Sequence, residues 1–181
     1  MDKAIAVEND MRKPVVDWLA AKGYEDAHEC YVGGHYCDVI GFRFATRAGR
    51  PVPQLRAVVC VELKMSNVQQ VIRQARGNAR SCNASYAAMP LDRCAKMRAT
   101  TRAIFSRRGI GLLSVDGLRV AVQIPAVRLH DGREQSYKRT WWRWHLRNEK
   151  KKPRPSPARG QAIERGGRRR HDGKRETDEN C

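Results

Sequence analysis

Two carboxylates and one lysine lie in apolar stretches of this sequence, where charged side chains are costly. Asp38 lies in the segment YCDVIGF, and Glu62 and Lys64 lie in the segment VVCVELKM. Desolvating such groups in a strand is unfavourable unless they are paired or bound to a metal. Residues two apart in a strand leave the same face, so Glu62 and Lys64 share a face. If the two strands pair, Asp38 lies near Glu62.

This set of side chains could support metal-assisted hydrolysis of a phosphodiester. Two carboxylates, a backbone carbonyl and water form an oxygen-ligand site suited to Mg²⁺ (or Mn²⁺). An adjacent ammonium can steer or help deprotonate a water and can stabilise a charged phosphorane. The alternative is that Asp38 or Glu62 forms an ion pair with Lys64 that only joins two strands.

The elements that must position these residues follow from hydrophobic periodicity and turn residues. The resulting order is that of a mixed α/β domain with one sheet. Pro14 inside the first helix predicts a kink or a start near Lys13. The expected elements are a helix at 4–22 ended by Gly23, strands at 27–32 and 36–44, a loop at 45–56, a strand at 57–65, a helix at 67–80, a strand at 85–89, a helix at 92–107, and strands at 111–115 and 118–124.

The spacing of Asp38 and the triplet Glu62-Leu63-Lys64 resembles the PD-(D/E)XK motif of the restriction-endonuclease-like nucleases. The resemblance covers roughly residues 4–124, and Cys37 stands where the motif has proline. It implies an α/β fold with a restriction-endonuclease-like αβββαβ core, in which a mixed central sheet is flanked by helices. It also implies that Asp38, Glu62 and the Leu63 carbonyl bind the metal and that Lys64 assists the attacking water.

The resemblance adds one residue from each flanking helix. In many members a glutamate of the first helix joins the metal ligands, and Glu8 is placed for that role. It lies seven residues before Val15, at the border of the apolar stripe. A glutamine on the helix after the lysine strand is often near the site, and Gln74 matches it best, with Gln70 one turn earlier.

The charge of the chain points to a polyanionic partner. There are 36 Lys and Arg against 19 Asp and Glu, a net charge of +17. From Asn148 onward apolar residues almost vanish, and such a segment cannot offset its ordering entropy. We therefore expect three parts: residues 1–137 as the nuclease-like domain, 138–147 as a Trp- and Arg-rich segment, and 148–181 as a disordered basic tail.

Aromatic and basic residues near the end of the chain could hold nucleic acid, because bases stack on tryptophan and cations contact phosphates. The alternative is that these tryptophans pack on the sheet. Arginines of the helix at 67–80 could contact phosphates or form a solvated surface. The nucleic-acid-binding candidates are Arg73, Arg76, Arg80, Lys138, Arg139, Trp141, Trp142, Arg143, Trp144, Lys150, Lys151 and Lys152.

Four potential zinc ligands crowd into ten residues: His28, Cys30, His35 and Cys37. Their spacing matches no closed structural zinc site, so buried thiols and surface imidazoles are the simpler interpretation. The six cysteines form no CxxC pair, and a chain of this length needs no disulfide scaffold. We therefore expect the cysteines to be free thiols in a reducing compartment.

No stretch approaches the roughly 20 apolar residues of a membrane span, and the N-terminus lacks signal-peptide features. These patterns together predict a cytoplasmic, Mg²⁺-dependent deoxyribonuclease of prokaryotic or phage origin. We expect an endonuclease that acts in DNA processing, repair or restriction, with DNA favoured over RNA. The alternatives are a non-catalytic nucleic-acid-binding protein and a zinc-dependent interaction module. The sequence is compatible with a homodimer and with a protein partner that loads the chain onto its target.

Overall fold

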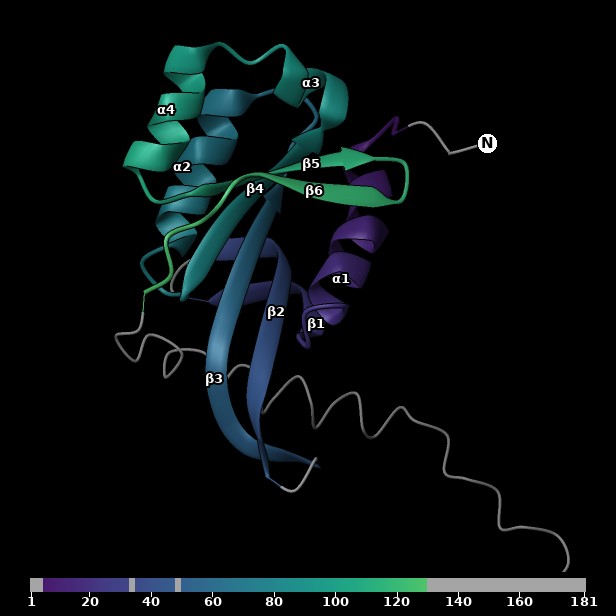
Figure 1. Cartoon of the computed structure of the whole chain (residues 1–181), viewed down its shortest axis with the longest axis vertical. Coiled ribbons are helices and arrows are strands. Elements are labelled where there is room, and N and C mark those ends of the chain that lie inside the picture. Colours follow the sequence, from purple (N-terminus) through teal and green to yellow (C-terminus); the bar gives the residue numbers. More distant parts are fainter. Residues whose placement is uncertain (1–4, 33–34, 48–49, 130–181) are drawn as a thin grey trace, which may run out of the picture.

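The computed structural model describes residues 5–32, 35–47 and 50–129, and their side chains except those of 26–35 and 47–53. The described chain forms one six-stranded sheet flanked by helices (Figure 1). Its elements are η1 (Glu8–Met11), α1 (Arg12–Ala20), β1 (Glu25–Val32), β2 (His35–Arg47), β3 (Arg50–Leu63), α2 (Val68–Asn78), β4 (Ala84–Pro90), α3 (Leu91–Ala95), α4 (Ala99–Arg107), β5 (Gly111–Asp116) and β6 (Arg119–Ile124).

The sheet is mixed, and its strands lie in the order in which they occur along the chain. β1, β2 and β3 are antiparallel, β3, β4 and β5 are parallel, and β6 returns antiparallel to β5. α2 connects β3 to β4, and α3 and α4 connect β4 to β5, as parallel strands require. The expected order of helix, three strands, helix and strand is therefore present.

The helices cover opposite faces of the sheet. α1 packs on one face, and α2, α3 and α4 pack on the other (Figure 1). β4 shows why both faces need cover: Tyr86 and Ala88 join the α1-side core, whereas Ala87 and Met89 join the core that contains Phe105 of α4. Such a strand reads as a continuous apolar run rather than an alternating one.

Close packing at β4 also explains one glycine. The Tyr86 ring meets Trp18 of α1 edge-on, with 5.5 Å between the ring centroids. A Cβ at Gly111 of β5 would lie 2.1 Å from the Tyr86 ring, so any side chain there would displace the tyrosine. Gly111 thus allows the aromatic pair to anchor α1 on the sheet.

Two helices differ from the sequence expectation at their boundaries. The first begins as the single 3-10 turn η1 and becomes α-helical at Arg12, which puts Pro14 in the first α-helical turn. There a missing N–H removes little hydrogen bonding. The helix expected at 92–107 is two helices, because α3 ends at Ala95 and α4 begins only at Ala99.

The loop expected at 45–56 was wrong, because both strands continue through it. Residues 43–47 of β2 pair with 50–57 of β3, although the register shifts near Phe44. β1 pairs with β2 only as far as Phe42, and β4 pairs with β3 only from Val59 onward. This two-stranded extension, residues 43–47 and 50–57, is called the ribbon below. Prolines suggested a loop, but an unpaired strand edge tolerates proline.

Candidate catalytic and metal site

Asp38 and Glu62 are brought together by the pairing of β2 with β3. Val39 pairs with Val61, so the two carboxylate residues follow one position further along the ladder. Their carboxyl groups lie close enough to share a hydrogen bond. Asp38 Oδ2 also accepts a hydrogen bond from the Leu63 N–H at 2.8 Å, which fixes its orientation. The juxtaposition predicted from the sequence is confirmed.

The environment of Glu62 favours its protonated form in the absence of a cation. The side chain is only 1% exposed, and it leaves the α2 side of β3. Burial is the largest cause and the charge of Asp38 the second, and together they raise the pKa of the Glu62 carboxyl to about 8. A buried carboxyl beside another carboxylate is a common sign of a functional site. A cation between the two groups would relieve the repulsion.

Lys64 is held by Glu8 at the end of β3. The Lys64 Nζ lies 3.0 Å and 3.2 Å from the two carboxylate oxygens of Glu8. Lys64 is 17% exposed and Glu8 43% exposed, so the ion pair sits at the rim of the site. Glu8 therefore neutralises the lysine in this structure. Its role as a metal ligand stays a prediction.

Helix α2 supplies two amides on one face toward this region. The Asn78 Nδ2 donates to the Glu62 Oε1 at 2.5 Å, an opposing contact that lowers the pKa of that carboxyl. Gln74 lies one turn earlier on the same face. Its buried Oε1 has no hydrogen-bond partner among the residues that the structure describes. Sequence reasoning identified Gln74 but missed Asn78, although its spacing of three from Ala75 and seven from Val71 marks it as a polar residue on the apolar face.

Three buried thiols lie behind the carboxylates. Cys60 hydrogen-bonds with both Cys37 and Cys82, and burial contributes to raising the pKa of Cys37 and of Cys82. Protonated, buried thiols are inert packing groups rather than metal ligands. These three and Cys94 are free thiols, as expected. The other proposed zinc ligands, His28, Cys30 and His35, lie outside the described side chains.

The residues present fit an oxygen-bound divalent cation held by two side chains. Two observations favour such an ion: the adjacent carboxylates repel each other, and the buried amide oxygen of Gln74 has no partner within the described part of the chain. Mg²⁺ is often bound through one or two carboxylates and otherwise by water and phosphate. Within the described part of the chain, no group of three or more His, Cys, Asp or Glu side chains could hold a metal.

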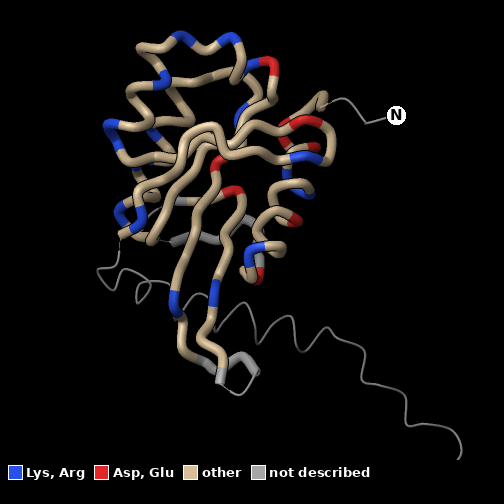
Figure 2. Tube along the Cα trace, in the orientation of Figure 1, with Lys and Arg blue, Asp and Glu red and all other residues tan. Residues whose placement is uncertain are grey.

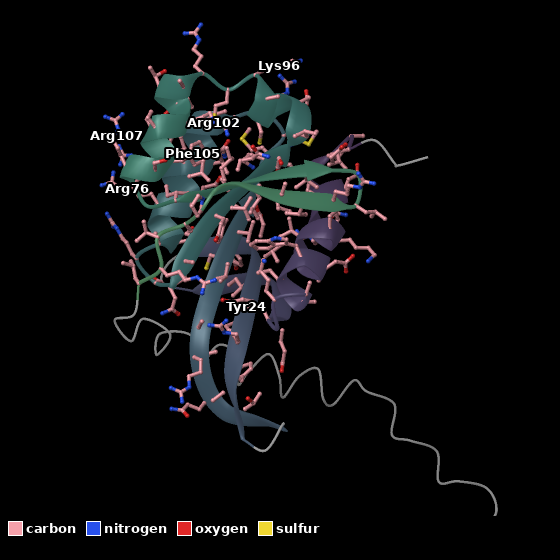
Figure 3. All side chains as sticks on the ribbon, in the orientation of Figure 1. Tyr24, Arg76, Lys96, Arg102, Phe105 and Arg107 are labelled. Carbon is pink, nitrogen blue, oxygen red and sulfur yellow. The ribbon has the colours of Figure 1, made fainter. Side chains whose placement is uncertain are left out.

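The predicted nucleic-acid contacts fall into two groups. Arg73, Arg76 and Arg80 are exposed on and just after α2. In Figure 3, Arg76 of α2 and Arg107 of α4 both point away from the body of the molecule. The other predicted contacts lie beyond the described residues, in 138–152. Lys and Arg positions follow the whole α2–α4 side (Figure 2).

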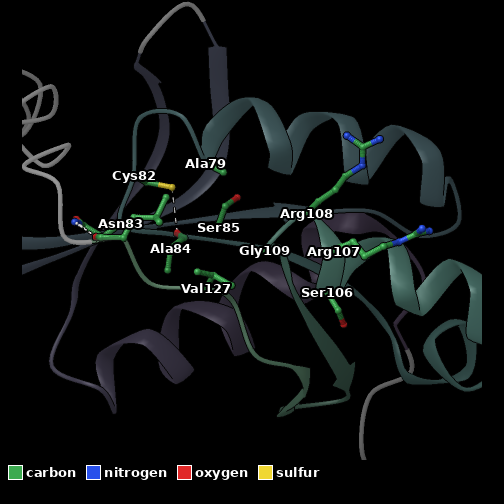
Figure 4. Close-up of a pocket in the computed structure, with 11 residues that line it drawn as sticks. Ala79, Cys82, Asn83, Ala84, Ser85, Ser106, Arg107, Arg108, Gly109 and Val127 are labelled. Carbon is green, nitrogen blue, oxygen red and sulfur yellow. Dashed lines mark hydrogen bonds between the residues drawn. The ribbon is translucent and has the colours of Figure 1, made fainter.

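One cavity among the described residues lies away from this site. It has a volume of about 320 Å³ and lies where β4 begins, between the ends of α2 and α4 (Figure 4). Two of its polar side chains are used internally, because Asn83 donates to the Leu129 carbonyl and Ser85 donates to the Ala75 carbonyl.

Comparisons with known proteins support the architecture alone. No protein-family model matches this sequence, and no curated protein is similar to it. A solved structure with a similar fold is the SPO1766 protein of unknown function from Silicibacter pomeroyi. The two chains are 16% identical with a TM-score of 0.52, and the match covers 83% of this chain and 97% of the other. None of the described helices is long and apolar enough to cross a membrane.

Proposed function

We propose that this protein is a metal-dependent nuclease with a restriction-endonuclease-like core and that its substrate is DNA. The observation that carries the proposal is the contact between Asp38 and Glu62, two carboxylates from neighbouring strands with Lys64 two residues further on. The order of helix, three strands, helix and strand supports it. The excess of cations around the α2–α4 side supports a polyanionic substrate.

Each residue would contribute one part of a phosphodiester hydrolysis. Asp38 and Glu62 would hold Mg²⁺ or Mn²⁺, which when bound neutralises phosphate charge and acidifies water. The Leu63 N–H keeps the Asp38 carboxylate in place, and Asn78 does the same for Glu62. Lys64 can leave Glu8 for a substrate oxygen, since the ion pair is at the rim. Gln74 can orient a water or a phosphate through its unpartnered amide oxygen.

A second candidate function is nucleic-acid binding without catalysis. Residues 66–110 contain nine Lys and Arg but one Asp and no Glu, which favours a polyanion whether or not it is cleaved. In that case Asp38 and Glu62 would only join β2 to β3. The two functions differ in whether a divalent ion is required.

The test is cleavage of labelled single-stranded, duplex and branched DNA, and of RNA, with Mg²⁺, Mn²⁺ or EDTA. Lys64→Ala should abolish metal-dependent cleavage and keep most binding. Lys13→Ala is the matched control, because Lys13 is also paired with a carboxylate, Asp17, at 2.6 Å. Binding to every substrate without cleavage under any metal would favour the second function. Cleavage unchanged by Lys64→Ala would contradict the proposed site.

A further inference from the structure

The ribbon extends the two strands that carry the carboxylates away from the body of the fold. Figure 1 shows β2 and β3 continuing together beyond the helices and the other strands. Phe44 pairs with Leu55 where the ribbon leaves the body, and both contact the small core that includes Phe42. Beyond this pair the described side chains Thr46 and Gln54 are exposed. The base of the ribbon is therefore anchored, and these two side chains beyond it face solvent.

The ribbon carries charge of one sign. Between Asp38 and Glu62 the sequence contains four arginines and no Asp or Glu. Arg43 lies over the Tyr24 ring, 5.2 Å from its centroid, on the α1 side. Arg56 is exposed, and no hydrogen bond or ion pair of its side chain exists among the described residues. Two described arginines therefore lie on the ribbon, and no carboxylate among the described residues forms an ion pair with either of them.

Strand addition by another protein is a poor explanation of the ribbon. The outer edge of β3 contains Pro51 and Pro53, which have no N–H to donate. The ladder between β2 and β3 is irregular within the ribbon, with register shifts after Arg43 and after Phe44 that leave extra residues in β3. Prolines and bulges are the devices that protect exposed strand edges from pairing. The ribbon is thus built to stay two-stranded in solvent.

We infer that the ribbon is a duplex-DNA-binding arm that enters the major groove beside the carboxylate site. The major groove admits a two-stranded β-ribbon and has a phosphate strand on either side. Arg56 lies six residues before Glu62 in β3, so the two positions are roughly 20 Å apart along the strand. A ribbon at that separation would engage the groove within one turn of the scissile phosphate. The inference rests on the proposed function for its choice of partner.

The test is duplex binding by the full chain in EDTA, measured by fluorescence anisotropy at several salt concentrations. Arg56→Glu should weaken binding about tenfold and lower the salt dependence by about one phosphate contact. Gln54→Glu adds a charge at an exposed position without removing an arginine, and it should weaken binding in the same direction. Arg119→Glu, at an exposed arginine of β6, is the matched control and should change the affinity less than twofold.

Groove entry is tested with a duplex that carries bulky groups at cytosine C5. This substrate should bind wild type more weakly than the plain duplex, and Arg56→Glu should reduce that difference. If Arg56→Glu weakens binding no more than Arg119→Glu does, the assignment of the ribbon as a DNA-binding arm is wrong. Equal losses on single-stranded DNA or RNA would overturn the duplex assignment. Because binding is measured without metal, this test is independent of the nuclease proposal. If the protein proved unable to cleave DNA, the assignment of the ribbon as a DNA-binding arm would still stand.

Discussion

The two faces of the sheet bury similar apolar cores but carry very different charge. The α1 side, residues 5–25, has three Lys and Arg against four Asp and Glu, whereas residues 66–110 on the α2–α4 side have nine against one. Figure 2 shows the contrast. Folding does not require the excess, since α1 packs well without it. The difference therefore points to a partner on the α2–α4 side, where Glu62 also lies.

The largest expected effect comes from removing one carboxylate on the α2–α4 side. Glu62→Gln keeps an oxygen that can accept from Asn78, so the fold should be retained. Metal-dependent cleavage should fall by about a thousandfold or more, since the ion supplies several kcal/mol. Asp17→Asn on the α1 side is the control and should leave cleavage unchanged. Cleavage rates are measured by gel assays over time. Equal rates for wild type, Glu62→Gln and Asp17→Asn would contradict a functional difference between the two faces.

The next effect concerns affinity for DNA. Arg76 and Arg107 point outward from α2 and α4 (Figure 3), and reversing both to Glu should weaken duplex binding at least about tenfold. The same reversal at Lys13 and Lys22 on the α1 side should cost less than threefold. Anisotropy titrations at fixed salt, with thermal unfolding to confirm folding, measure the difference. Similar losses on both sides would show that only net charge matters.

A smaller effect is the pH dependence of stability without metal. Native Glu62 keeps its proton up to about pH 8, against a reference pKa of 4.5. The unfolded state binds fewer protons between these values, so the free energy of unfolding should fall as pH rises, by up to about 1.4 kcal/mol per pH unit. Glu62→Gln should remove this slope, and Mg²⁺ should oppose the loss near pH 8. Thermal unfolding in EDTA from pH 5 to 8.5 tests this, and parallel slopes for both proteins would refute it.

The smallest effect is expected for the surface ion pair of α1. Lys13 and Asp17 are 74% and 54% exposed, and such pairs contribute about 0.5 kcal/mol or less. Asp17→Asn should therefore change the free energy of urea unfolding by no more than this amount. A larger loss would mean that the α1 side depends on its charges, which would weaken the comparison of the two faces.

The part of the site that could be predicted from the sequence consists of charged residues in apolar segments. Asp38 and Glu62 were identifiable because burial makes such residues expensive, and one ladder then brings them together. The ribbon was missed because Pro51 and Pro53 favour a loop, and only the absence of a neighbouring strand makes them acceptable in β3. Glu8 was expected beside the carboxylates, but its distance from Lys64 depends on tertiary packing of η1 that no local pattern encodes.

The face alternation along β3 has a consequence for how this gene can vary. Val58, Cys60 and Glu62 lie on the α2 side, whereas Val59 and Val61 face the α1 core. A deletion or insertion of one residue between Val58 and Glu62 would turn either the carboxylate or Val58 to the opposite face of the sheet. Changes of two residues preserve both orientations. Length changes inherited in this stretch should therefore come in pairs of codons.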